Sequence, residues 1–371
     1  MKNKIYKYDF LIIGAGLIGA LAGLALNKKN FKVLVVEKNN QSLLDQRTLA
    51  VNANSRDFLN SLGLWHNLIN EPIQNIIIED EINATPLVFE NVNEPMGSVV
   101  YNKDLLLKAR NQLKKNNLLI ENVELDINKI DFNQAIKLKN KYYIFSKIIL
   151  SVGKNITSNK QFKKSTFTSH HKSYVGFFNH RLNHENKAYE IFTKKGPLAV
   201  LPAPSAKKYL STFIYSSKAP ITTIELKNLI KKYFHKTHGQ LFFMKEFKSF
   251  KISPHLMNSN NKNIIFIGDS LRSIHPVAGQ GWNLGIKDIQ TLTDLLDQYS
   301  VEDNNFSEIY FSRRKIENCA YLAFTNLINI LYESDNKINQ SIINFGFQSL
   351  LRFTPLRKTF INQAMGRFSL V

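Results

Sequence analysis

The chain has 371 residues, 44% of them hydrophobic and 21% charged, with a formal net charge of +20 and a sequence pI near 9.7. This length and apolar content suffice for two or three domains with packed cores. The single cysteine, Cys319, excludes an internal disulfide and indicates a reducing, cytoplasmic compartment. Neither a CxxC nor an HExxH pattern occurs, so we expect no metal centre.

The excess of positive charge favours anionic partners such as nucleic acid, acidic lipid or a phosphorylated cofactor. Most of it is lysine scattered among asparagines, and the sequence has neither an arginine-rich helix nor an RNA-reading motif. We therefore expect solvated lysine-rich faces and no nucleic-acid binding. Attraction to an anionic membrane surface, such as that of the inner membrane, is the main functional alternative.

The N-terminal stretch has the pattern of a phosphate-binding turn. Phe10–Ile13 is a short apolar run suited to a central parallel strand, and Gly14-x-Gly16-x-x-Gly19 follows it and opens a helix of small residues. A second strand ends in Glu37, where an acidic side chain accepts hydrogen bonds from an adenosine ribose. The run is shorter than the about 20 residues of a membrane span and leads into another strand, which excludes a span or signal peptide. The stretch therefore predicts dinucleotide binding.

Helices and strands then alternate before a stretch rich in strands. Tyr142–Leu150 should return to the first sheet, and Ser151-Val152-Gly153 follows it. Period-2 stretches between 165 and 250 predict a largely antiparallel sheet, with 196–204 as a turn-rich piece inside it. The other expected elements are a helix at Ser55–Leu62, strands of a different sheet within Ile76–Phe89, a helix at Lys103–Lys115, strands near Leu118–Val123 and Ala135–Leu138, a helix at Leu226–His235, and a helical tail from Asn304.

A second glycine-bearing turn lies near the other end of the chain. The apolar strand Ile264–Ile267 leads to Gly268 and Asp269, and His275-Pro276 then forces an extended piece. Gly279-Gln280-Gly281 follows, and apolar residues then recur at helical spacing. Exposed amides are thereby held at a helix N-terminus, where the peptide dipole favours negative charge. A reduced flavin carries such charge around its N1 and O2 atoms.

With these motifs the chain resembles the class A flavoprotein aromatic hydroxylases, of p-hydroxybenzoate hydroxylase-like fold, and above all the ubiquinone-biosynthesis hydroxylase family. The likeness covers nearly the whole chain. It is carried by Gly14-x-Gly16-x-x-Gly19 with Glu37; by Asp45-x-Arg47-x-x-Ala50 with Ser61-Leu62-Gly63-Leu64-Trp65; by Ala188-Tyr189-Glu190-x-Phe192-Thr193-x-x-Gly196-Pro197-Leu198-Ala199-x-Leu201-Pro202; by Gly268-Asp269 with His275-Pro276-x-Ala278-Gly279-Gln280-Gly281-x-Asn283-x-Gly285; and by a tail with Arg313-Arg314 and Gln363-Ala364-Met365-Gly366.

The resemblance and the order of the elements imply an α/β fold. A Rossmann-type FAD-binding domain would comprise residues 1–72, 97–160 and 255–303. An inserted antiparallel β-sheet domain for the substrate would comprise 73–96 and 161–254, and a helical C-terminal region 304–371. We expect the substrate pocket between the two sheet-bearing domains, where the flavin ring emerges.

The resemblance also implies the cofactor and its contacts. FAD would be bound at its adenosine end by Gly14, Gly16, Gly19 and Glu37. Its pyrophosphate and ribityl region would be held by Arg47 and Asp269. The flavin ring would be faced by Gly279, Gln280, Gly281 and Asn283.

The family reduces FAD with NAD(P)H, reacts it with O2 and hydroxylates a prenylated phenol through a flavin C4a-hydroperoxide. The chemistry is the cofactor's, and the protein supplies orientation, a dry pocket and fixed dipoles. We assign no catalytic residue and expect His275 to shape its loop. The prenyl tail implies a long apolar pocket, a membrane-derived substrate and contact with other ubiquinone-biosynthesis proteins.

Two departures from the family pattern keep other functions open. The strand that returns to the first sheet is usually followed by an Asp-Gly pair, but here Ser151-Val152-Gly153 lacks the aspartate. Arg272 stands where the family commonly has histidine, and would add positive charge near the flavin or pyrophosphate. The alternatives are a flavin-dependent isoprenoid reductase of the same fold and a flavin-binding scaffold of the biosynthetic complex. The tail Ile342–Phe368 would rest on a membrane or pack as ordinary helices.

Overall fold

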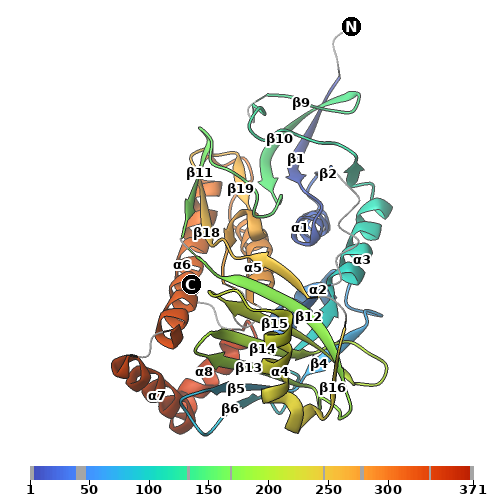
Figure 1. Cartoon of the computed structure of the whole chain (residues 1–371). Coiled ribbons are helices and arrows are strands. Elements are labelled where there is room, and N and C mark those ends of the chain that lie inside the picture. Colours follow the sequence, from blue (N-terminus) through green and yellow to red (C-terminus); the bar gives the residue numbers. More distant parts are fainter. Residues whose placement is uncertain are drawn as a thin grey trace.

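The first strand of the chain is the centre of its main sheet. The computed structural model describes residues 4–38, 47–131, 134–167, 169–244, 247–275, 280–333 and 336–367 (Figure 1). Parallel pairing gives the strand order β19-β10-β1-β2-β8, and β9 joins β10 in antiparallel orientation. The strands are β1 (Ile5–Ile13), β2 (Val33–Glu37), β8 (Leu119–Glu121), β9 (Ile136–Leu138), β10 (Lys141–Leu150) and β19 (Ile264–Phe266). The predicted return of the strand near 142–150 to the first sheet is confirmed.

Helices cover this sheet and bury its apolar strands. Phe10 and Ile12 pack in one core with residues of α1 (Leu17–Lys28), α3 (Asn102–Lys115) and α5 (Gln280–Leu295). The continuous apolar run of β1 suits a parallel strand covered on both faces. The helix expected at Ser55–Leu62 is α2 (Ala53–Ser61), and it begins earlier because the Asn52 side chain accepts a hydrogen bond from Ser55 N at 2.9 Å and caps it.

The second large sheet has eight strands and is antiparallel except where β13 pairs with β5. Its order is β16-β12-β15-β14-β13-β5-β6, and β17 also pairs with β12. Both sequence predictions for this region are confirmed, because 165–250 is largely antiparallel and the strands within 76–89 belong to this second sheet. The strands are β5 (Asn75–Asp80), β6 (Leu87–Glu90), β12 (Lys172–His180), β13 (Lys187–Thr193), β14 (Gly196–Pro202), β15 (Leu210–Ser217), β16 (Leu241–Phe243) and β17 (Lys248–Lys251).

The prediction of a turn-rich piece at 196–204 is wrong for most of its length. Gly196–Pro202 forms β14, which pairs with β13 on one side and β15 on the other. Both prolines lie near the strand's ends, where a missing N–H costs least, and Leu198, Ala199 and Val200 fill the ladder between them. A side chain at position 196 would lie 1.9 Å from Ser216 O, so this glycine serves a close approach of two strands rather than a turn.

Two smaller sheets join the large ones. The first, in the order β3-β7-β4, contains β3 (Thr48–Asn52), β4 (Asn70–Ile73) and β7 (Gly97–Tyr101), and the second, in the order β11-β18-β20, contains β11 (Phe162–Thr166), β18 (His255–Ser259) and β20 (Arg272–Ser273). The short 3-10 helix η2 (Gly268–Ser270) links β19 to β20.

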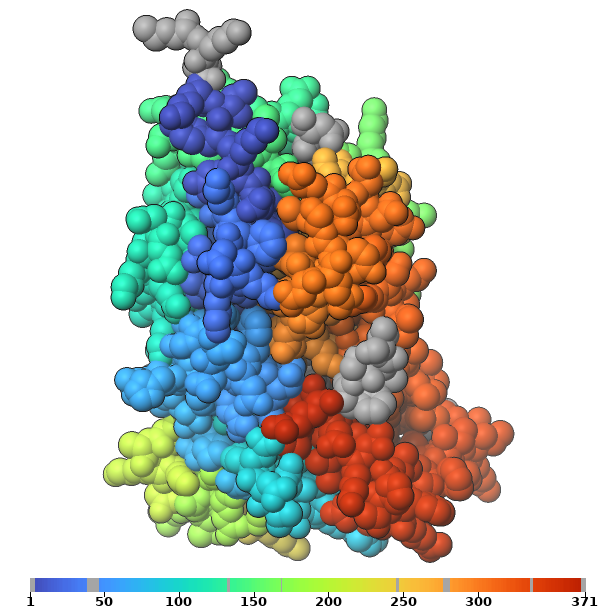
Figure 2. All heavy atoms as spheres, turned by 180° about the vertical axis from the view of Figure 1, so that it is seen from behind, coloured from blue at the N-terminus to red at the C-terminus, as the bar shows by residue number. Residues whose placement is uncertain are grey.

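The C-terminal tail is helical, as predicted, and its helices contact the eight-stranded sheet. They are α6 (Phe306–Glu333), α7 (Lys337–Arg352) and α8 (Thr354–Ala364), drawn in orange and red in Figures 1 and 2. Tyr332 stacks on Phe192 with ring centroids 4.7 Å apart, and Phe360 stacks on Phe89 at 4.8 Å. The division of the chain into three regions at the boundaries given above stays a prediction.

Helix α4 (Thr223–His238) covers the other face of this sheet and encloses three histidines. It starts at a capping box formed by Thr222 and Glu225. His180, His184 and His238 are each at most 4% exposed, and the His180 and His238 ring centroids are 4.7 Å apart. Burial, then the positive charge of neighbouring groups, lowers the pKa of His184 to about 4 and of His238 to about 3. All three rings are therefore neutral in the native protein at neutral pH.

This histidine cluster predicts loss of stability in mild acid. Histidines with a depressed native pKa stabilise the fold fully above their ordinary pKa of 6.5. This contribution falls as the pH drops towards the native pKa values, because the unfolded chain then binds more protons. The free energy of unfolding should decrease by about 2–4 kcal/mol between pH 6.5 and 4, and His238→Phe should flatten this slope in urea titrations. His235→Phe, at an exposed site on the same helix, is the control and should keep the slope.

Candidate functional site

The first glycine turn lies where β1 ends beside β10. Gly14 has φ +101°, and a Cβ built there would lie 2.3 Å from Ser151 O. Ser151 N in turn donates to Ile13 O at 2.9 Å. Only glycine fits position 14, because both the left-handed backbone and the contact with the neighbouring strand exclude a side chain.

The next two motif glycines have different surroundings. Gly16 is the residue before α1, and among the described residues no heavy atom lies within 4 Å of a Cβ built there. The first turn of α1 has no acidic residue, so the positive end of the helix dipole is not balanced by a carboxylate of that turn. A Cβ at Gly19 would lie 2.0 Å from Gly14 O, which is the close packing of helix against strand that the motif predicts.

Glu37 lies beside this turn, as predicted, and it is held there by two groups. Ala15 N donates to Glu37 Oε2 at 2.7 Å, and Arg110 Nη2 lies 3.3 Å from the same oxygen. Arg110, on α3, also donates from Nε to Ala15 O at 2.8 Å and is 3% exposed. Sequence reasoning missed Arg110. The available signal was an arginine on the same helical face as Leu106 and Leu113, where a buried cation needs a specific partner.

The second glycine turn meets the first around one side chain, Ile18. A Cβ at Gly268 would lie 3.2 Å from Ile18 Cγ2, and one at Gly285 would lie 2.7 Å from Ile18 Cδ1. Ile18 is in the first turn of α1, directly after the open position at Gly16. The two glycine-bearing turns, about 250 residues apart in the chain, therefore converge at the N-terminus of α1.

A third segment of the site follows the end of β10, the strand that lies between β1 and β19 in the sheet. Gly153 N donates to Ser270 Oγ at 2.9 Å, and Ser270 is completely buried in η2. The missing aspartate of the Asp-Gly pair is thus accompanied by a hydroxyl that binds the loop backbone directly. The carboxyl ends of β1, β10 and β19 meet here, which is where open parallel sheets bind their ligands.

A buried carboxylate on α5, Asp288, holds the second turn in place. Its Oδ2 accepts from Gly268 N at 2.8 Å and from Arg272 Nη1 at 2.6 Å, while its Oδ1 accepts from Arg314 Nε at 2.7 Å. Arg272 is 3% exposed and its charge is matched by Asp288, so the structure uses it inside the fold rather than presenting it to the cofactor.

The charge pairs continue along α6. Arg314 also binds Glu317, which receives Lys287 Nζ at 2.7 Å. Burial opposes ionisation of Glu317, but the charges of Arg314 and Lys287 outweigh it and lower the pKa of the carboxyl. Sequence reasoning missed Asp288, although an acid two turns from Gly281 on the buried face of a helix was a usable signal.

The predicted ring-facing residues lie at the start of α5. A Cβ at Gly281 would meet Ile274 Cγ1 only at 3.9 Å. Asn283 is 5% exposed and binds the edge of β3: its Oδ1 accepts from Asn52 N at 3.1 Å and its Nδ2 donates to Ala50 O at 2.9 Å. Gly279 lies outside the described residues, and for Gln280 only the backbone at the start of α5 is described. The ring-facing role of these residues stays a prediction.

Arg47 and Asp269 are both exposed. The Arg47 guanidinium is 5.7 Å from the ring centroid of Phe250 on β17, and its backbone oxygen accepts from Asn102 N at 2.9 Å. Asp269 is exposed in η2, and its backbone oxygen binds His255 Nε2 at 3.1 Å. Both charged ends are accessible to a ligand, and their predicted contacts with the pyrophosphate and ribityl region stay untested.

His275 is buried directly after β20. It is 2% exposed, and among the described residues neither ring nitrogen has a hydrogen-bond partner. Burial, then the charge of His171, lowers the pKa of His275 to about 4, so its ring is neutral at neutral pH. His171, whose ring centroid is 5.0 Å away, binds Glu333 at the end of α6.

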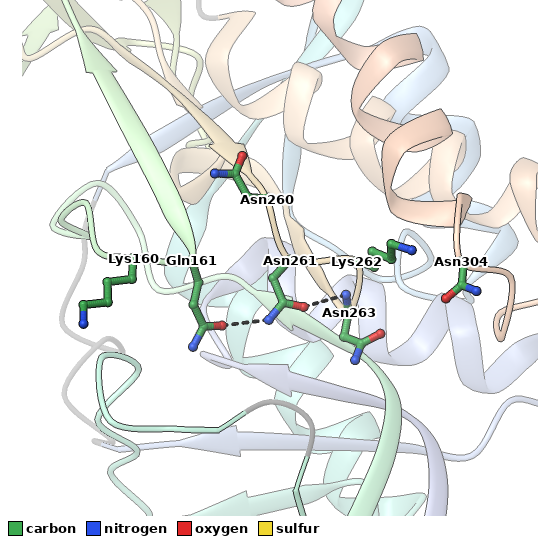
Figure 3. A pocket seen from close by; sticks show the side chains of 7 residues that line it. All are labelled: Lys160, Gln161, Asn260, Asn261, Lys262, Asn263 and Asn304. Atoms are coloured by element: carbon green, nitrogen blue, oxygen red, sulfur yellow. Dashed lines mark hydrogen bonds between the residues drawn. The ribbon is translucent and has the colours of Figure 1, made fainter.

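An open polar cavity of about 440 Å³ lies away from these turns. Asn261 Nδ2 donates to Gln161 Oε1 at 2.8 Å, and Asn261 Oδ1 accepts from Asn263 N at 2.8 Å (Figure 3). Among the described residues the lining includes no residue predicted to bind the cofactor: it consists of Lys160, Gln161, Asn260, Asn261, Lys262, Asn263 and Asn304. The side chains at its wall hydrogen-bond to one another, so we assign it no role.

The arrangement at the two turns fits a dinucleotide. A free helix N-terminus with an open glycine suits a pyrophosphate, and the acid at the end of β2 suits a ribose. The second turn brings another helix N-terminus and another open glycine, Gly281, to the same end of the sheet. The residues present therefore fit a dinucleotide such as FAD.

Comparison with known proteins agrees with this geometry. The sequence matches the FAD binding domain family over residues 7–139 and 155–302. Ubiquinone hydroxylase UbiL of Rhodospirillum rubrum is 23% identical, with 98% of this chain and 90% of UbiL covered. Ubiquinone biosynthesis monooxygenase COQ6 of Dictyostelium discoideum is 22% identical, with 98% and 92% covered. The solved structure of p-nitrophenol 4-monooxygenase PnpA from Pseudomonas putida DLL-E4 shares the fold, with a TM-score of 0.74, 12% identity and 98% of each chain covered.

Two glycine variants should separate cofactor binding from folding. Gly16→Ala adds a methyl group in open space, so the free energy of unfolding of the apoprotein should change by less than about 1 kcal/mol. FAD affinity, measured by flavin fluorescence, should fall at least about tenfold because the pyrophosphate needs that space. Gly14→Ala should instead destabilise the apoprotein by more than about 2 kcal/mol. Unchanged FAD affinity in Gly16→Ala would show that the pyrophosphate does not bind at this turn.

Asp288→Asn should strongly destabilise the protein. It leaves two buried arginines without their shared counter-charge, and breaking such a pair typically costs about 3–5 kcal/mol. Urea unfolding measures the loss. The control is Asp297→Asn, which breaks an exposed pair with Lys29 and should cost less than about 1 kcal/mol. Equal losses of unfolding free energy in the two variants would show that the buried network stabilises the protein no more than an exposed ion pair does.

Proposed function

Since the chain belongs to the FAD binding domain family and is an FAD-dependent monooxygenase, we propose that it hydroxylates the ring of a polyprenylated phenol in ubiquinone biosynthesis. The observation that carries the proposal is the meeting of two glycine turns at the N-terminus of α1, in a chain similar to ubiquinone hydroxylases along nearly its whole length. Bound FAD would supply electron uptake from NAD(P)H and the activation of O2.

In this proposal the chain's own residues bind and orient the cofactor. The α1 N-terminus and the open backbone at Gly16 receive the pyrophosphate, while Gly14 and Gly19 keep strand and helix close enough to form that cradle. Glu37 accepts the ribose hydroxyls and is itself oriented by Ala15 N and Arg110. Arg47 and Asp269 hold the region between pyrophosphate and ring.

At the other end, the dipole of α5 stabilises negative charge on the reduced ring. Gly279, Gln280, Gly281 and Asn283 face that ring, and Asn283 keeps the start of α5 tied to β3 through two hydrogen bonds. Asp288 holds the turn at Gly268, so the ring's surroundings are set before the cofactor binds. The substrate ring would then lie between the flavin and the eight-stranded sheet, in a pocket that excludes water.

The prenyl tail places the substrate in a lipid bilayer before it reaches the enzyme. We therefore propose that the protein works at the surface of the inner membrane, next to other proteins of ubiquinone biosynthesis. The net charge of +20 supports attraction to acidic lipid.

The test is uptake of 18O from O2 into a short-chain prenylphenol by FAD-loaded protein with NADPH or NADH. We expect one labelled oxygen atom per product molecule, and Gly16→Ala should give product only in proportion to its bound FAD. Flavin reduction with transfer of hydrogen to the prenyl chain would identify an isoprenoid reductase instead. A flavin spectrum that does not bleach with either nucleotide, with or without phenol, would identify a scaffold.

A further inference from the structure

From Ile316 onward, α6 presents an apolar stripe to solvent. Ile316, Phe324, Leu327 and Ile330 are 57%, 48%, 53% and 63% exposed. Their spacing places them on one side of the helix, together with the exposed Cys319. The opposite side is the one that packs, since Leu322 and Thr325 are buried there. Apolar side chains therefore occupy both sides of this helix.

Helix α7 continues the same arrangement. Ile343 and Phe347 are buried in the core cluster that contains Leu331. Ile338, Ile342 and Phe345 recur at i, i+4 and i+7 on the other side and are 67%, 50% and 76% exposed. Helix packing thus accounts for one face of the tail and leaves the other face uncovered. We call the exposed residues of α6 and α7, Ile316, Phe324, Leu327, Ile330, Ile338, Ile342 and Phe345, the apolar face.

The apolar face contains more neighbouring exposed apolar side chains than the scattered single residues found on most protein surfaces. Single exposed apolar residues are normal, but contiguous patches on a monomer usually mark an interaction site. In Figure 1 α7 lies at the outer edge of the molecule, and the view from behind in Figure 2 also shows α6 to α8 along one side. Nothing in the described part of the chain covers the apolar face.

Most charges next to the apolar face in the sequence are positive. Residues 337–371 contain five basic residues and no acidic residue: Lys337, Arg352, Arg357, Lys358 and Arg367, of which Arg367 is paired with Glu94. On α6, Lys315 is exposed next to Ile316. The acidic residues of α6 from Ile316 onward are already bound, Glu317 by Arg314 and Lys287 and Glu333 by His171, and Asp335 follows the helix in the sequence. The net charge of the residues that flank the apolar face is therefore positive.

We propose that the apolar face docks on the surface of an anionic phospholipid bilayer. Aliphatic and aromatic side chains with a lysine and arginine rim are the composition of helices that lie in the membrane interface. No helix in the described ranges is long and apolar enough to cross a membrane, so α6 and α7 would lie along the surface. The inference assigns a specific surface to the membrane attachment of the proposed function, and its test does not depend on the proposed reaction.

A second copy of the chain fits this face less well than lipid does. A two-fold dimer would bring the same patch of both copies together, and with it two sets of positively charged flanking residues. Like charges facing each other across an interface cost affinity, whereas acidic lipid headgroups neutralise those residues.

The test is flotation of the full-length apoprotein with vesicles. It should float with phosphatidylglycerol–phosphatidylcholine vesicles, much less with pure phosphatidylcholine, and binding should weaken at about 0.5 M salt. The triple variant Ile338→Gln, Ile342→Gln, Phe345→Gln should lower the partition coefficient about a hundredfold with unchanged circular dichroism and melting temperature. Vesicles should also slow alkylation of Cys319 by a membrane-impermeant maleimide.

The matched control is Ile69→Gln, Val92→Gln, Ile224→Gln, which removes three apolar side chains that are 67%, 97% and 72% exposed outside the apolar face. It should bind anionic vesicles like the wild type. Equal losses in both triple variants, or a wild type that does not float, would overturn the proposal. A concentration-dependent dimer that the first triple variant abolishes, without flotation, would assign the face to a second copy. Because none of these measurements needs FAD or phenol, failure of the proposed reaction leaves their outcome unaffected.

Discussion

The structure depends on close backbone contact around a single isoleucine. Ile18, in the first turn of α1, lies against Gly268 and Gly285, while Gly14 and Gly19 lie against each other and against Ser151. A side chain at any of these positions would push the ends of three parallel strands and two helices apart. Glycine is required at these positions mainly because there is no room for a side chain. They let two helix N-termini reach one end of the sheet, which is where open parallel sheets bind their ligands.

A buried charge network keeps that geometry from relaxing. Asp288 joins the turn at Gly268 to two arginines, Arg272 and Arg314, which come from β20 and α6. Burying these charges costs desolvation free energy. Because Asp288 also accepts a hydrogen bond from Gly268 N, the network fixes the backbone of the second turn. The position of the second turn is set by a buried carboxylate that two buried arginines hold in place. Arg110 does the equivalent at the first turn, where it binds both Glu37 and Ala15 O.

Helix α6 connects this interior to the outside. Its first half supplies Arg314 to the network, and Tyr310, whose hydroxyl donates to Phe266 O at 2.9 Å at the end of β19. From Ile316 onward it carries the apolar stripe, and it ends on the eight-stranded sheet, where Tyr332 stacks on Phe192. The surface proposed to bind lipid and the turn proposed to bind flavin are therefore connected through one helix.

The sequence by itself determined the parts of this protein that depend on local signals. The strand before Gly14, the spacing of the glycines, the acid at position 37 and the helix after Gly281 are readable because backbone geometry and period act over a few residues. Only the tertiary structure decided which distant groups become partners. It paired Arg272 and Arg314 with Asp288, and it made Gly196–Pro202 a central strand by placing β13 and β15 beside it. It also chose which face of α7 is buried, since apolar residues lie on both faces and only packing against the sheet distinguishes them. Burial and pairing are set by contacts between segments far apart in the chain, and a local pattern carries no information about those contacts.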